Sequence, residues 1–168
     1  MTLPLNIILP EDLKELHRDL TLMYEDIATV VNGYQDTWTP TVEGDTTVGV
    51  GTYTTQTGYY YRQGLLCDCW FSVVLSAHTG TGDMKVKLPF KIKDSSDVWI
   101  GEVLDSNLTY PSGTKVVLSG INDTFFVGLT VCGDGIASAA VQLDTAVQVV
   151  TPWTLTGHIR FIGVADEI

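Results

Sequence analysis

The sequence has few charged residues, and those it has are mostly acidic. Charged side chains make up 17% of the 168 residues, against about 25% in an average soluble domain. Nine basic and 20 acidic residues give a formal net charge of −11. A protein that binds nucleic acid needs a basic surface to displace counterions from phosphates, so nucleic acid is excluded as a partner. The hydrophobic content of 45% excludes a disordered acidic tail, which lacks apolar surface to bury.

Long apolar runs and paired cysteines are also lacking. No run approaches the roughly 20 apolar residues that span a bilayer, so no membrane insertion is predicted. Residues 1–10 lack a basic start and a small-residue cleavage site, and we expect no signal peptide. Of the three cysteines, Cys67 and Cys69 lie two apart, a geometry that resists a mutual disulfide. No second Cys or His pair has zinc-ligand spacing, so we expect buried thiols and no metal.

No motif of a known catalytic class is present. The sequence has no G-x-S-x-G, P-loop, dinucleotide-binding or H-E-x-x-H pattern. The histidines have no Ser or Cys at nucleophile spacing: His17, His78 and His158. We therefore expect no enzyme and no cofactor. A two-carboxylate glycosidase stays open as an alternative, because four acids could meet in space: Asp105, Asp123, Asp134 and Asp144.

One group of oxygen-bearing residues suggests a cation. Asn122 and Asp123 together with Asp134 could form a calcium-like cluster. These residue types are also the ordinary choice for tight turns, because their side chains hydrogen-bond to nearby backbone. The turn interpretation is the simpler one, so no calcium site is predicted.

Residues 9–34 are predicted to form a helix. Pro10 suits a first-turn position, where its missing N–H costs nothing. The apolar residues are spaced by alternating steps of four and three, which is an unbroken heptad seam. The pattern indicates a coiled coil rather than a helix packed on its own domain, and by itself it does not select dimer or trimer. The seam consists of Leu9, Leu13, Leu16, Leu20, Met23, Ile27, Val30 and Tyr34.

From Trp38 onward the apolar period becomes two. In residues 65–78 one face reads Leu, Cys, Cys, Phe, Val, Leu, Ala, which predicts a strand with one buried face. Gly80-Thr81-Gly82 predicts a turn into a second strand over 84–90, and further strands are expected at 98–104, 114–119, 124–132, 138–143 and 153–163. The predicted fold is mainly β: an antiparallel β-sandwich or jelly-roll-like head over 37–168, behind a short helical stalk over 1–36.

The order of several short motifs resembles a known family. These are Trp38-Thr39-Pro40, a glycine-rich turn over 49–53, Gly58-Tyr59-Tyr60-Tyr61 with Gly64, and Leu88-Pro89-Phe90. Together they resemble the C-terminal β-domain of tail-fibre and other virion-appendage proteins of double-stranded DNA phages. The resemblance implies a homotrimer on the virion, on the capsid surface or a tail appendage. Its N-terminus would join other virion proteins, and its head would contact the host.

The expected function is therefore that of a non-enzymatic, fibre- or spike-like virion protein that attaches to a host surface glycan or protein. Exposed aromatics stack on sugars or anchor protein partners, so the candidate contact residues are Tyr59, Tyr60, Tyr61 and Trp99. Packing in the core or a trimer interface is the other interpretation of this group. The rival functions are a capsid-decorating or assembly protein without a receptor, a carbohydrate-active enzyme, and a cellular trimeric signalling domain.

The scarcity of charge supports self-association. Residues 35–168 carry 21 charged side chains in 134 positions. A monomeric sandwich needs charged faces and edges to stay soluble and unpaired. The sequence thus predicts that part of this surface meets another copy of the chain.

Overall fold

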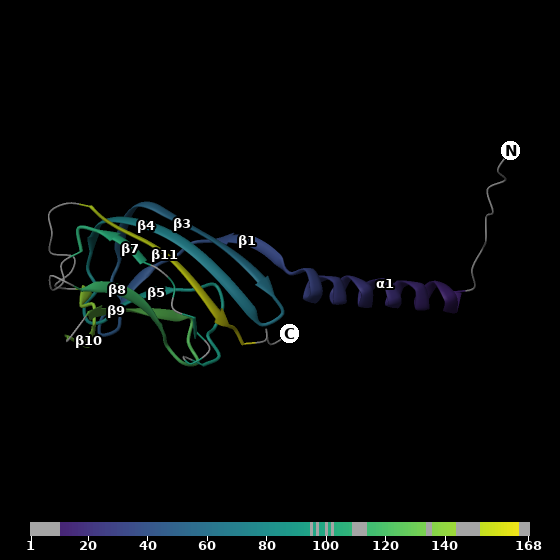
Figure 1. The fold of residues 1–168 in the computed structure, drawn as a ribbon. Coiled ribbons are helices and arrows are strands. Elements are labelled where there is room, and N and C mark those ends of the chain that lie inside the picture. The colour runs from purple at the N-terminus through teal and green to yellow at the C-terminus, as the bar shows by residue number, and fades with distance from the viewer. Residues whose placement is uncertain are drawn as a thin grey trace.

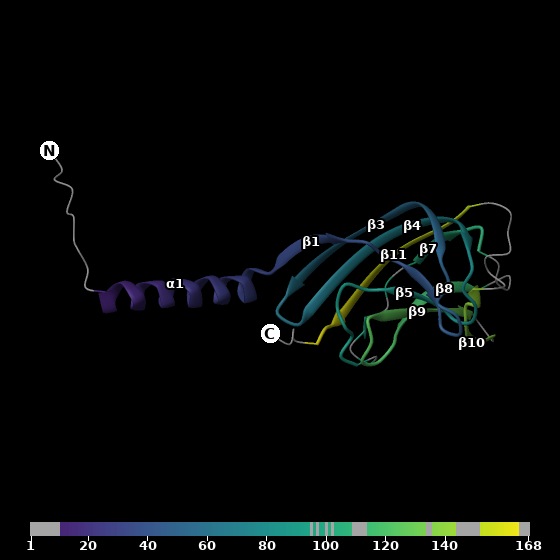
Figure 2. The same ribbon diagram turned by 180° about the vertical axis from the view of Figure 1, so that it is seen from behind.

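A long helix leads into two antiparallel β-sheets (Figures 1 and 2). The computed structural model describes residues 11–94, 96, 98–99, 101, 103–108, 114–133, 136–143 and 152–164. The elements in these ranges are α1 (Glu11–Asn32), β1 (Tyr34–Trp38), β2 (Val42–Gly44), β3 (Gly51–Gln63), β4 (Leu66–His78), β5 (Met84–Lys87), β6 (Val98–Trp99), β7 (Val103–Ser106), β8 (Lys115–Gly120), β9 (Phe126–Gly133), β10 (Ile136–Ala140) and β11 (Trp153–Ile162). The prediction of a mainly β, antiparallel fold with one N-terminal helix is confirmed.

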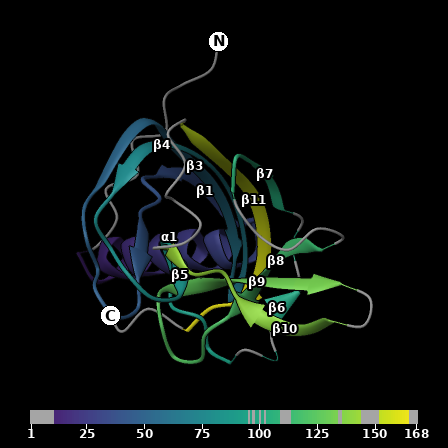
Figure 3. The ribbon, with the colours of Figure 1, turned by 90° about the vertical axis from the view of Figure 1, so that its left-hand side faces the viewer.

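The larger sheet has the order β1-β3-β4-β11-β6, with β7 also paired to β11. Its centre is the pair β4 and β11, which runs in unbroken register from Leu75 opposite Trp153 to Leu66 opposite Ile162. The smaller sheet has the order β10-β9-β5-β2, with β8 on the other edge of β9. In the end-on view the larger sheet curves over the smaller one (Figure 3). This two-layer arrangement is consistent with the predicted sandwich.

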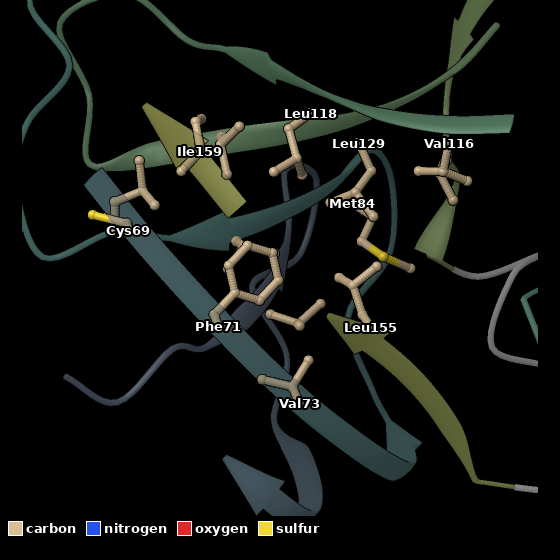
Figure 4. Close-up of a cluster of buried hydrophobic side chains, with 14 of the residues drawn as sticks. Cys69, Phe71, Val73, Met84, Val116, Leu118, Leu129, Leu155 and Ile159 are labelled. Carbon is tan, nitrogen blue, oxygen red and sulfur yellow. The ribbon is translucent and has the colours of Figure 1, made fainter. Parts of the chain in front are cut away.

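The core lies between the two sheets (Figure 4). Alternate residues of β4 point into it, as the sequence predicted for residues 67–75, and they meet buried side chains of β5, β8, β9 and β11. Gly157 lies on the same inward face, where the ring of Phe71 fills the space: a Cβ on Gly157 would lie 2.6 Å from Cζ of Phe71. The fully buried residues from β4 and β11 include Cys67, Cys69, Val73, Leu75, Trp153, Leu155, Ile159 and Phe161.

The helix α1 projects from one end of the sheets instead of packing on them (Figure 1). It ends at Asn32, and Gly33 turns the chain with a φ of 71°. The predicted extension to residue 34 was wrong, because Tyr34 begins β1, pairs with Arg62 and meets Tyr60 edge-on at 5.9 Å. Tyr34 therefore leaves the heptad seam. Leu9 lies outside the described residues, as does the side chain of Val30.

Some predicted strands differ from the observed ones. The strand expected over 84–90 ends at Lys87, and the one expected over 98–104 is divided into β6 and β7. Phe125 precedes β9 and is 45% exposed, so it does not join the buried row of that strand. In the part of the chain that the structure describes, no helix has both the length and the hydropathy to cross a membrane.

Candidate functional site

The outer face of the larger sheet carries a row of aromatic rings. Strand pairing places Tyr59 of β3 opposite Trp70 of β4, and Trp70 opposite His158 of β11. The imidazole of His158 stacks on the indole of Trp70, with ring centroids 4.8 Å apart and planes inclined by 10°. Tyr59 is 61% exposed and Trp70 43% exposed. The hairpin of β3 and β4 and the distant strand β11 thus present one accessible aromatic surface.

The adjacent row of the same face is rich in hydroxyl groups. Thr57, Ser72 and Thr156 follow one another across β3, β4 and β11, and Leu104 of β7 continues the row. The hydroxyls of Ser72 and Thr156 lie 3.1 Å apart. Together the two rows line an open groove of about 330 Å³. A groove of this size, mostly apolar with a few polar groups, is typical of small-molecule sites.

A buried carboxylate, that of Asp68, lies on the same outer face, in the row on the other side of the aromatic rings from the hydroxyl groups. Arg160 donates from Nε and Nη2 to the two carboxylate oxygens of Asp68, at 2.9 and 2.7 Å. Nε2 of His158 lies 3.0 Å from Oδ1 of the same carboxylate. Burial alone would raise the pKa of Asp68, but the hydrogen bonds from Arg160 and His158 outweigh it and lower that pKa. The carboxylate therefore stays charged and holds the His158 ring in place.

The structure separates the four aromatic residues singled out from the sequence. Tyr59 lines the groove, and Tyr61 lies on the same outer face, where its hydroxyl donates to the carbonyl of Asn32 at 2.9 Å. Tyr60 points to the opposite face and meets Phe90 edge-on at 4.8 Å, and burial raises the pKa of its phenol. Trp99 lies in β6 opposite Arg160, and its side chain is outside the described part of the chain.

Sequence reasoning did not identify the groove itself. From the sequence, Trp70 falls on the mixed face of its predicted strand and His158 on the polar face of the last predicted strand, and Leu104 has no predicted role. The useful signal in the sequence is that Asp68 and Trp70 share the outward face of one strand, and His158 and Arg160 share the outward face of another strand. Only the β4–β11 register, which joins them in pairs, turns these residues into a site.

Of the acids and histidines considered for catalysis, His158 lines the groove, and the other described ones lie elsewhere. Asp105 lies in β7 opposite the buried Leu155. Asp123 occupies a turn with a φ of 54° and forms an ion pair with Lys91 at 2.6 Å. His78 donates from Nε2 to the carbonyl of Val42 and is tied to its own turn, while His17 is exposed on α1. Asp134 and Asp144 lie outside the described residues, and within those residues no cluster of metal-ligating side chains is found.

A second hollow, of about 350 Å³, lies on the smaller sheet. The ammonium group of Lys85 sits over the ring of Phe126 at 4.4 Å, and the side chain of Gln142 contacts Asp83. The carboxylate of Asp45 accepts the backbone N–H of Asp83 at 2.7 Å, a hydrogen bond that lowers the pKa of Asp45. These polar groups of the second hollow are thus engaged with neighbouring groups of the protein.

Comparison with known proteins gives a fold but no family. No family model matches the sequence, and no curated protein matches it either. Among solved structures, the crystal structure of the Dettilon tailspike protein (gp208) superposes with a TM-score of 0.61 at 15% identity, over 78% of this chain. The chain spans 24% of that protein's length. The class that follows is a mainly β protein whose fold is similar to part of a tailspike protein.

Proposed function

We propose that this protein is a homotrimeric virion surface protein, fibre- or spike-like, that attaches a virus particle to its host cell surface and is not an enzyme. The observation that carries the proposal is an apolar seam on a helix that leaves the β-sheets. Its members are between 46% and 54% exposed: Leu13, Leu16, Leu20, Met23 and Ile27. The likeness of the sheets to part of a tailspike protein supports a place on the virion.

The seam favours other copies of the same chain as its partner. Its members recur at the a and d positions of a heptad, which is the geometry by which helices pack around one another. Tyr24, at an e position, is 73% exposed and widens the apolar face beyond what two strands would cover. Three parallel copies would bury this face and place three β-heads on one side, with the N-termini free to join other virion proteins.

The groove is the candidate receptor-binding site of each head. It is open on the outer face of each head, so a trimer would present three equivalent sites on one rigid body. Three weak sites gain avidity when a surface offers repeated receptors. Asp68, a carboxylate beside the aromatic row, is paired with Arg160, which supports a binding role over hydrolysis.

Two measurements test the proposal. Light scattering on the purified full chain should give about three times the chain mass of 18.3 kDa, and labelled protein should decorate intact bacterial cells from a panel of strains. A monomeric mass would refute the trimer. A trimer that binds no cell would point to a capsid-decorating role. Release of reducing sugar from a surface polysaccharide would show an enzyme instead.

A further inference from the structure

The outer face of the larger sheet is almost free of charge. Besides Asp68, His158 and Arg160, its outward positions on β1, β3, β4 and β11 carry Thr, Ser, Gln, Tyr, Trp and aliphatic side chains. Asp68 and Arg160 are the charged residues on these four described strands that point outward, and they are bound to each other. A solvated face of this size ordinarily carries charges of both signs at about a quarter to a third of its positions. This face is therefore suited to a neutral partner with hydroxyl groups.

The groove on this face complements the two sides of a pyranose ring. A sugar ring presents a face of C–H groups and a rim of hydroxyls. The exposed rings of Tyr59 and Trp70 supply flat apolar surface for the first. The hydroxyls of Thr57, Ser72 and Thr156 lie in the adjacent row for the second. Leu104 of β7, which is 71% exposed, adds apolar surface at the end of the groove formed by that strand.

The aromatic platform is held rigid before any ligand arrives. The indole of Trp70 stacks on His158, the imidazole of His158 is fixed by Asp68, and Asp68 is fixed by two hydrogen bonds from Arg160. A half-exposed Trp that stands on such a chain of contacts loses little conformational freedom on binding. Preorganised aromatic side chains of this kind are what a stacking site requires.

We propose that this groove is a saccharide-binding site that takes a neutral pyranose unit of a host surface polysaccharide. The proposal rests on the attachment function above and names its receptor class. Tyr59 and Trp70 form the stacking platform, and Thr57, Ser72 and Thr156 bind the sugar hydroxyls. Asp68, His158 and Arg160 act as positioning residues that hold Trp70. A protein partner or a second copy would seal the row of hydroxyls away from water and is disfavoured for that reason.

The test uses the full chain and a panel of purified bacterial lipopolysaccharides and capsular polysaccharides on a biosensor. We expect binding to polysaccharides that contain neutral hexoses, and a loss of roughly tenfold or more in affinity for Trp70→Ala and for Tyr59→Ala. Phe125→Ala is the matched control, because it removes an exposed aromatic ring outside the groove. Trp70→Phe, which keeps an aromatic face, should retain more of the binding than Trp70→Ala.

Each result decides between the groove and the attachment function. Cell binding that persists unchanged in Trp70→Ala would overturn the groove and leave attachment intact. Cell binding without binding to any polysaccharide of the panel would indicate a protein receptor and overturn the saccharide assignment. A change of oligomeric mass in Trp70→Ala would show that this face is an interface between copies. Failure of the wild-type protein to bind any cell would overturn attachment itself.

Discussion

Leu20→Ala is the most direct test of the helical seam. Leu20 occupies an a position and is 51% exposed in the single chain, so about half of its side chain is available to be buried by other copies. Leu22 is 54% exposed and lies two residues further on, which is about 200° around the helix and away from the seam. Leu22→Ala makes the same chemical change at nearly the same exposure, so it is a matched control.

The size of the effect follows from the area that the seam leaves open. Burying a whole leucine side chain stabilises by about 1.5–3 kcal/mol, so burying the exposed half of Leu20 contributes about 1 kcal/mol per chain. All three chains change at once, which gives about 3 kcal/mol per trimer. At 1.4 kcal/mol for each factor of ten, the association constant falls roughly 100-fold. Since the dissociation constant of a trimer has units of concentration squared, the half-assembly concentration rises about tenfold.

Sedimentation equilibrium over a dilution series measures this shift. The Leu20→Ala protein should dissociate at about ten times the concentration at which the wild type does, while Leu22→Ala should overlay the wild type. Circular dichroism of each variant checks that the β-head remains folded. An equal shift for the two leucine variants, or a wild type that is monomeric throughout, would refute the reasoning that the a and d positions bury against other copies.

Three further predictions concern the head. Gly157→Val should lower stability by about 1–3 kcal/mol in urea unfolding, because the new side chain meets the ring of Phe71. The lowered pKa of Asp68 contributes stability that is present above the carboxyl's unfolded pKa and lost as pH falls through its folded value. Asp68→Asn should therefore lower the free energy of unfolding at pH 7 by about 1–2 kcal/mol, a modest loss because the half-exposed Arg160 can still be solvated. The variant should also lose less stability than the wild type as the pH falls below about 5. Burial raises the pKa of the Cys69 thiol, so in Ellman titrations Cys67 and Cys69 should react only after denaturation.

The central strand β4 and the helix could be predicted because their patterns of apolar residues depend only on neighbouring positions in the sequence. Over residues 67–75, side chains of strand β4 point alternately into the core and outward, and this alternation can be read from the order of the residues. The helix is equally clear from its heptad spacing. The end of the helix is less clear from the sequence. The spacing of Tyr34 continues the heptad, but Gly33 at a φ of 71° redirects the chain into β1. A single backbone conformation outweighed the hydrophobic pattern there.

Strands β1 and β3 carry weaker signals. The side chains of β1 are mostly exposed, so an apolar alternation had no reason to develop. In β3 the register with β4 shifts around Tyr53 and Thr55, which breaks the period of two near the start of the strand. The Gly58-Tyr59-Tyr60-Tyr61 stretch is recognisable as a motif in the sequence, but its place in an inner strand between β1 and β4 depends on pairing that the sequence does not state.

The groove could not be predicted for a related reason. Its members come from β3, β4, β7 and β11, and Trp70 and His158 are 88 positions apart in the chain yet stack on one another. The sequence shows which face of each strand is mixed in character, but the site exists only in the register between strands. Long-range pairing, not local pattern, brings Asp68 to Arg160 and so fixes the platform.

Charged residues are scarce in two separate places, the seam of the helix and the outer face of the larger sheet. On the helix, uncharged side chains form the seam, and the charged residues of the helix all lie outside it. On the larger sheet, the uncharged surface is concave, aromatic and lined with hydroxyls. Under the two proposals, the composition that first suggested self-contact divides into a seam that packs against other copies and a groove that binds a hydroxyl-rich ligand.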